Sequence, residues 1–113
     1  MSMTASYLIP IKTVPGLNAR EHWRTRAARV KTERTATALI VKPFPVPCIV
    51  RLIRQSSATV DDDNLQGACK AVRDEVAKIC GVDDKPGSGI TWAYAQEKVK
   101  RGVWAVRVEM LAI

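Results

Sequence analysis

The stretch DDDNLQGACKAVRDEVAKICGVDD, residues 61–84, decides the fold around it. Its apolar side chains recur at steps of three and four residues, namely at Leu65, Cys69, Val72, Val76 and Ile79. This spacing places them on one face of a helix, with polar residues on the other faces. We therefore predict a helix over Asn64–Cys80 that packs this face against a core. Carboxylates precede the helix at Asp61–Asp63 and follow it at Asp83 and Asp84.

The segments on either side predict the rest of the fold. The expected elements are, in chain order, a strand at Tyr7–Lys12, a helix from Ala19 or Arg20 to about Val41, a buried strand at Cys48–Arg54, and a hairpin of Ile90–Val99 and Val103–Ala112 that turns at Lys100, Arg101 and Gly102. The apolar face of the first helix is expected at Trp23, Ala27, Val30, Ala38 and Val41, interrupted by Arg34. The order β-α-β-α-β-β indicates an α+β fold, with two main helices against a small mixed β-sheet.

Length and composition limit the class of protein. A chain of 113 residues with 47% hydrophobic and 26% charged residues is expected to form a single domain over residues 1–113. Its three cysteines form no CxxC pair and it has one histidine, which argues against structural zinc. An odd number of cysteines is typical of reduced thiols, and no segment approaches the roughly 18 apolar residues of a membrane span. We expect a cytoplasmic protein without membrane contact.

The positive charge lies in the first half of the chain. Residues 1–60 carry ten basic and two acidic side chains, whereas residues 61–113 carry eight basic and nine acidic ones. A basic helix can bind a polyanion through phosphate contacts and counterion release, or it can be a solvated surface that binds nothing. The candidate DNA contacts on the first helix are Arg20, Arg24, Arg26, Arg29 and Lys31.

The acidic triplet Asp61–Asp63 predicts a site for a hard divalent cation. If the chain is still extended as it approaches the helix, Asp61 and Asp63 point the same way while Asp62 faces the other way. Carboxylates without histidine suit Mg²⁺, which needs only one to three of them together with water and phosphate. The alternative is a helix cap, because Asp63 and Gln66 have the spacing of a capping box. Bringing Asp84 to the triplet requires a return of the chain that spacing alone does not establish.

Several motifs of this chain resemble those of the RusA-type Holliday-junction resolvases of phages and prophages. They are Asp-x-Asp-Asn at residues 61–64, Lys-Ala-Val-Arg-Asp at 70–74, and Gly-Val-Asp-Asp at 81–84, with a short strand, a Pro-containing turn and a basic helix before them. The resemblance implies a small homodimeric endonuclease that uses Mg²⁺, or Mn²⁺ in its place, to cut two strands of a four-way DNA junction. It also implies that Asp61, Asp63 and Asp84 are the metal ligands, with Asp83 as a further candidate.

One position departs from the family pattern. The family has a functional lysine three residues after the asparagine, and this chain has Gly67 there and Lys70 one helical turn later. On a continuous helix, Lys70 would lie on the same stripe as Asp63 and lean toward the metal end, about 10 Å along the axis. The expected mechanism is water activation by Mg²⁺ with Lys70 stabilising the phosphorane, without a nucleotide cofactor. Two alternatives remain: a non-catalytic basic DNA-binding module, and a Mg²⁺ nuclease that acts on other branched DNA.

Overall fold

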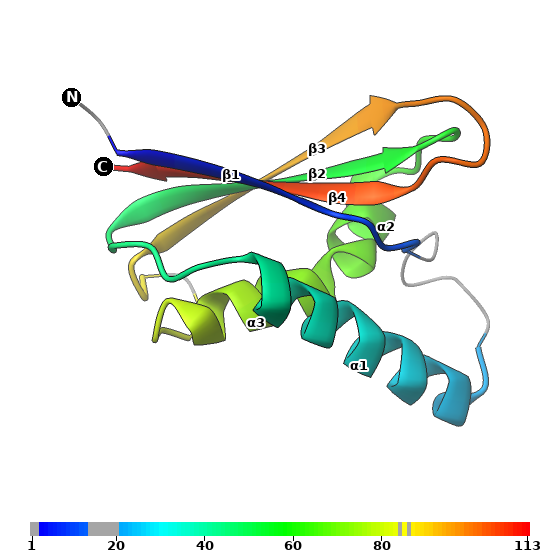
Figure 1. Ribbon diagram of the computed structural model, residues 1–113, viewed down its shortest axis with the longest axis horizontal. Coiled ribbons are helices and arrows are strands. Elements are labelled where there is room, and N and C mark those ends of the chain that lie inside the picture. The colour runs from blue at the N-terminus through cyan, green and yellow to red at the C-terminus, as the bar shows by residue number, and fades with distance from the viewer. Residues whose placement is uncertain (1–2, 14–20, 84, 86) are drawn as a thin grey trace.

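The computed structural model describes residues 3–13, 21–83, 85 and 87–113. The elements in this part of the chain are β1 (Thr4–Ile9), α1 (Trp23–Ile40), β2 (Cys48–Ser56), α2 (Asp62–Ala68), α3 (Lys70–Ile79), β3 (Ile90–Lys98) and β4 (Ala105–Ala112). The predicted α+β class is confirmed, with a mixed sheet and helices in nearly the expected order (Figure 1). No helix among the described residues is long and apolar enough to cross a membrane.

The strands form one sheet in the order β1-β4-β2-β3. β4 pairs antiparallel with β1 and β2, whereas β3 pairs with β2 in parallel. The predicted hairpin of Ile90–Val99 with Val103–Ala112 is therefore wrong, because β2 lies between these two strands. The link 99–104 instead passes the end of β2, where the backbone N–H of Val99 donates to the carbonyl of Ser56 at 3.0 Å. A short glycine-containing link is compatible with a hairpin and also with two strands that are separated by a third one. Only the long-range pairing of β2 with β3 and β4 distinguishes these two arrangements.

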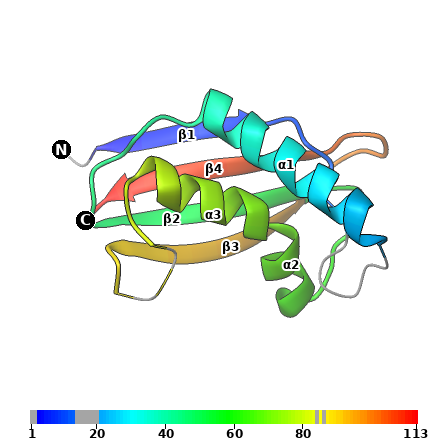
Figure 2. The same ribbon diagram turned by 90° about the horizontal axis from the view of Figure 1, so that it is seen from below.

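All three helices lie on one side of the sheet (Figures 1 and 2). The parallel pair β2 and β3 needs a crossover connection, and α2 and α3 supply it. Strand residues that face the helices form the core, which includes Val50, Leu52, Val106, Val108 and Met110, each at most 1% exposed. β2 is thus the buried strand that its apolar sequence predicted, and it is paired on both edges. No helix formed by the described residues covers the opposite face of the sheet.

The predicted helix Asn64–Cys80 is divided into two. α2 ends at Ala68 and α3 begins at Lys70, with Cys69 between them at φ −92° and ψ 0°. Figure 2 shows that the axis of α2 turns away from that of α3. Gly67 lies in the last turn of α2, two residues before Cys69, and glycine lowers helix propensity. The apolar stripe is buried on both pieces nevertheless, as the sequence predicted.

The buried face of α1 differs from the predicted one. Trp23 at the start of the proposed stripe is 66% exposed, and the buried residues of the helix are Glu33 at 1% and Thr37 at 0%. These polar side chains find partners nearby, because Glu33 accepts from Arg29 and the Thr37 hydroxyl donates to the Glu33 carbonyl. Apolar residues occur on several sides of this helix, so the contacts with β1 and α3 decide which side is buried.

Candidate metal and nucleic-acid site

Asp61 caps α2. Its backbone is extended at φ −72° and ψ 169°, and its Oδ1 accepts from the backbone N–H of Asn64 at 3.0 Å. Asp62 and Asp63 already belong to the first helical turn, so the extended approach predicted for Asp61–Asp63 is wrong, and α2 begins two residues before Asn64. The side-chain cap comes from Asp61 rather than from the predicted Asp63. The physical reason is that an exposed carboxylate one residue before a helix satisfies an otherwise unpaired N–H.

The three carboxylates of this turn are solvent-exposed on an ordered backbone. A negative charge near a helix N-terminus is favoured by the macrodipole, and exposed oxygens of this kind can also coordinate a hard cation together with water. Within the part of the chain that the structure describes, no group of three or more acidic, histidine or cysteine side chains has the geometry to hold a metal ion.

The chain that leads into this turn is held against β3. The backbone N–H of Val60 donates to Gln96 Oε1 at 2.8 Å, and Gln96 Nε2 donates back to the Val60 carbonyl at 2.7 Å. The buried Arg54 donates to the Ala58 carbonyl at 3.0 Å and to the Thr13 hydroxyl at 2.9 Å. These contacts position Asp61 relative to the sheet. Sequence reasoning missed the contacts of Gln96 with Val60 and of Arg54 with Thr13, because the partners lie 36 and 41 residues apart along the chain.

Asp83 lies at the opposite end of the molecule from Asp61–Asp63. The triplet follows the last residue of β2, whereas Asp83 precedes β3, whose first residue pairs with the first residue of β2. β2 spans nine residues, or about 26 Å at 3.3 Å per residue. Because β2 and β3 run in parallel, the segment after β2 and the segment before β3 lie at opposite ends of the sheet. Asp83 and the triplet of the same chain therefore do not form one site. Asp84, the predicted last ligand, lies outside the described residues.

Lys70 pairs with a carboxylate on its own helix. Its Nζ lies 3.3 Å from Asp74 Oδ2, four residues along α3, and its side chain is 64% exposed. The break at Cys69 removes the continuous stripe on which Lys70 was expected to lean toward Asp63. Lys70 remains at the start of α3, close along the chain to the acidic turn, but its contact in this structure is with Asp74.

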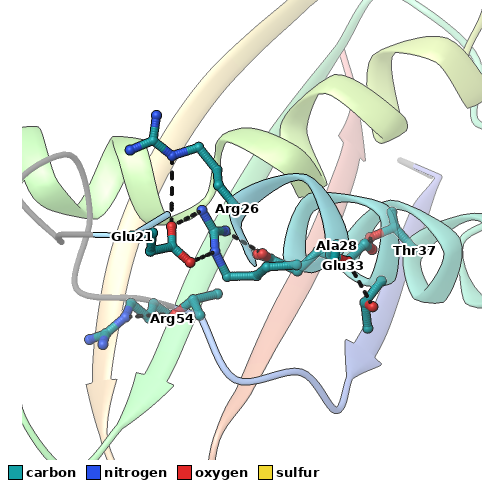
Figure 3. Close-up of polar contacts among 9 residues, drawn as sticks. Glu21, Arg26, Ala28, Glu33, Thr37 and Arg54 are labelled. Atoms are coloured by element: carbon teal, nitrogen blue, oxygen red, sulfur yellow. Dashed lines mark hydrogen bonds and ion pairs between the residues drawn. The ribbon is translucent and has the colours of Figure 1, made fainter. Parts of the chain in front are cut away.

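The candidate DNA contacts on α1 are not equivalent. Arg29 donates through Nε and Nη2 to Glu21 at 2.9 Å each and through Nη1 to Glu33, so its guanidinium connects two carboxylates. Glu21 also lies 3.8 Å from Arg26 (Figure 3). These pairings raise the pKa of Arg29, chiefly through the hydrogen bond to Glu21, and make Arg29 a structural residue.

The remaining candidates on α1 are exposed. The Arg24 guanidinium lies 5.1 Å from the ring centroid of Trp23, and Arg26 and Lys31 reach solvent. Arg20 lies outside the described residues. The exposed basic groups that α1 retains for a polyanion are therefore Arg24, Arg26 and Lys31.

Comparison with known proteins adds no relative. No protein-family model matches the chain, and neither curated proteins nor solved structures include a match.

Proposed function

We propose that this protein is a Mg²⁺-dependent endonuclease that cuts branched DNA and resolves four-way junctions. The observation that carries the proposal is the exposed aspartate turn Asp61–Asp63, ordered by an N-cap and by β3 at one end of a strongly basic protein. The Asp-x-Asp-Asn and Gly-Val-Asp-Asp motifs, which resemble those of RusA-type resolvases, support the same activity. Free cysteines among the described residues support action in the cytoplasm.

Asp61 and Asp63 would hold Mg²⁺, or Mn²⁺ in its place. When bound, the ion polarises a phosphate and lowers the pKa of a coordinated water. Residues of the chain would supply the other functions. Asp61 holds the start of α2 through its cap, and Arg24 and Arg26 attract the DNA backbone. Lys70 can exchange Asp74 for a phosphate oxygen. No protein nucleophile is required, and no nucleotide cofactor.

A homodimer would complete the site. Asp83 and Asp84 belong to the segment before β3, and within one chain Asp83 lies far from the triplet. A two-fold axis perpendicular to the strands reverses their direction, so it places this segment of one copy at the same end of the dimer as the triplet of the other. Two such sites would face a substrate that has near two-fold symmetry itself. A metal site that includes both acidic segments would therefore need a second copy of the chain.

The open face of the sheet is the surface we propose for this dimer. It carries exposed leucines, Leu8 at 50% and Leu111 at 40%, beside a hollow of about 490 Å³. Arg51 pairs with Glu109 at 3.2 Å on the same face. A face with both charge signs can pair its arginine with the glutamate of a second copy, which makes it complementary to itself.

The test is a comparison of cleavage rates on a four-way junction, a flap and a linear duplex in Mg²⁺. We expect the junction to be cut fastest, and Asp61→Asn or Asp63→Asn to slow cleavage by roughly a hundredfold or more, because a charged metal ligand is lost. Asparagine retains the cap at position 61, so the fold is preserved.

Glu97→Gln, at another exposed carboxylate, is the matched control. Equal rates on all three substrates would exclude junction specificity, and full activity of both asparagine variants would exclude the metal site.

A non-catalytic DNA-binding module is the second candidate function, and one observation favours it. Asp61 caps α2 and therefore has a structural role that needs no metal. Under this alternative the protein binds branched DNA but does not cleave it in Mg²⁺ or Mn²⁺. Both asparagine variants would then bind DNA at least as tightly as the native protein, because each removes a negative charge.

A further inference from the structure

A second basic surface lies at the end of the sheet where β2 and β3 finish. We call it the basic rim, and it consists of Lys12, Lys98, Lys100 and Arg101, all exposed. Lys98 is the last residue of β3, Lys100 and Arg101 belong to the link to β4, and Lys12 follows β1. The sequence pattern presented Lys100 and Arg101 only as turn residues. The strand order brings Lys12 to them from the other end of the chain.

Local contacts order this surface. The Lys12 ammonium lies 4.4 Å from the ring centroid of Trp104, a cation–π contact that holds a charge of β1 beside the link to β4. Within the link, the Val103 N–H donates to the Lys100 carbonyl at 3.2 Å, and Gly102 has φ 89°, a conformation that favours glycine. The basic side chains thus project from a defined turn.

The basic rim is adjacent to the aspartate turn. β3 pairs with β2 up to Ser56 and Lys98, and Gln96 of β3 holds Val60, the residue before Asp61. Figure 2 shows the link between β3 and β4, α2 and the start of α1 at the same end of the molecule. The described acidic residues nearby are Asp61–Asp63 and the exposed Glu97. Both cations and carboxylates are therefore present at this end.

We propose that the basic rim binds the sugar–phosphate backbone of a DNA arm and thereby places it beside the aspartate turn. The inference rests on the proposed function for the identity of its ligand. Lysine and arginine side chains on an exposed turn contact phosphates without reading bases, so this surface positions an arm and selects no sequence. The carboxylates alone would repel the same backbone, and the rim offsets that repulsion even before a cation is bound.

The experiment measures binding without cleavage. Fluorescence anisotropy of a labelled four-way junction in EDTA is followed over a range of salt for the native protein, for Lys100→Gln/Arg101→Gln, and for Lys42→Gln/Lys78→Gln. The control pair removes the same charge from exposed positions near the C-terminal ends of α1 and α3. We expect the rim variant to bind at least about tenfold more weakly near 0.1 M salt. Its log–log salt slope should fall by about 2, because each lost phosphate contact contributes about 0.9.

The outcomes separate this inference from the proposed function. Equal weakening in both variants would mean a general charge effect and would overturn the inference, as would unchanged binding in the rim variant or an absence of DNA binding by the native protein. A native protein that binds through the basic rim but cuts no branched DNA in Mg²⁺ would overturn the nuclease proposal and support the inference. Circular dichroism of each variant verifies that the fold is retained.

Discussion

Asp61 has two roles at the scale of the residue, and substitutions can separate them. Its Oδ1 caps α2, and the same carboxylate is a proposed metal ligand. Glu33 is a different case, since it is 1% exposed, its Oε1 has no hydrogen-bond partner among the described residues, and Arg29 compensates its charge. Neither environment can be read from the residue type alone, because each depends on a neighbour that the fold supplies.

Replacing Asp61 by alanine should destabilise the protein by about 1 kcal/mol, the usual loss for an N-cap. Asp61→Asn should stay within about 0.5 kcal/mol of the native protein, because asparagine caps as well as aspartate does. Urea unfolding of the two variants measures the difference. Equal stabilities would show that the hydrogen bond to Asn64 contributes nothing.

Glu33 should make stability depend on pH. Burial is the largest influence on its carboxyl and raises its pKa above 4.5, while Arg29 partly offsets the increase. Below the pKa of the unfolded state, the carboxyl is protonated in both states and does not change the stability with pH. As pH rises from there through the pKa of the folded state, the unfolded chain ionises more readily than the buried group, so the folded state loses stability. The stability of the native protein relative to Glu33→Gln should therefore fall from about pH 4.5 upward, as urea midpoints will measure. A difference that grows with pH would contradict the assignment.

At the scale of the element, patterns with one clear apolar face were predicted correctly and diffuse patterns were not. The stripe is buried from Leu65 to Val76 and partly buried at Ile79, and β2 is the buried strand that was expected. α1 has few large apolar residues and turns Glu33 and Thr37 inward. Local spacing also left the break at Cys69 unseen, because the apolar stripe continues across it.

Two leucines test these burial assignments. Leu52 on β2 is fully buried, whereas Leu39 on α1 is 74% exposed. Leu52→Ala should cost about 3 kcal/mol, since it removes buried methylene groups and leaves a cavity, and Leu39→Ala should cost less than about 0.5 kcal/mol. Chemical denaturation of both variants provides the comparison. A large loss for Leu39→Ala would mean that this side of α1 is covered in solution.

At the scale of the whole molecule, the sheet has helices on one side and an open face on the other. This arrangement leaves Leu8 and Leu111 exposed and places the described acidic segments at opposite ends. Both features follow from the β2-helices-β3 crossover, which is parallel and uses one side of the sheet. The exposed leucines of the open face are the basis of the proposed dimer.

Charge on the open face should dissociate the proposed dimer. Leu111→Glu should sediment as a monomer at concentrations where the native protein is a dimer, because an unpaired carboxylate would be buried in the interface. Leu39→Glu on the helix layer is the matched control and should remain dimeric. Analytical ultracentrifugation distinguishes the two. A native protein that is monomeric at all concentrations, or a dimer unaffected by Leu111→Glu, would exclude this interface.

The sequence by itself determined the α+β class, the buried character of β2, the buried stripe of α2 and α3, and the aspartates that make Asp61–Asp63 a candidate site. Each of these depends on residues close together in the chain. Only the tertiary structure decided that β2 separates β3 from β4, that α1 buries Glu33, and that Asp83 lies at the far end from the triplet. These features depend on pairings between distant segments, whose free energy comes from the whole sheet and core rather than from any local pattern.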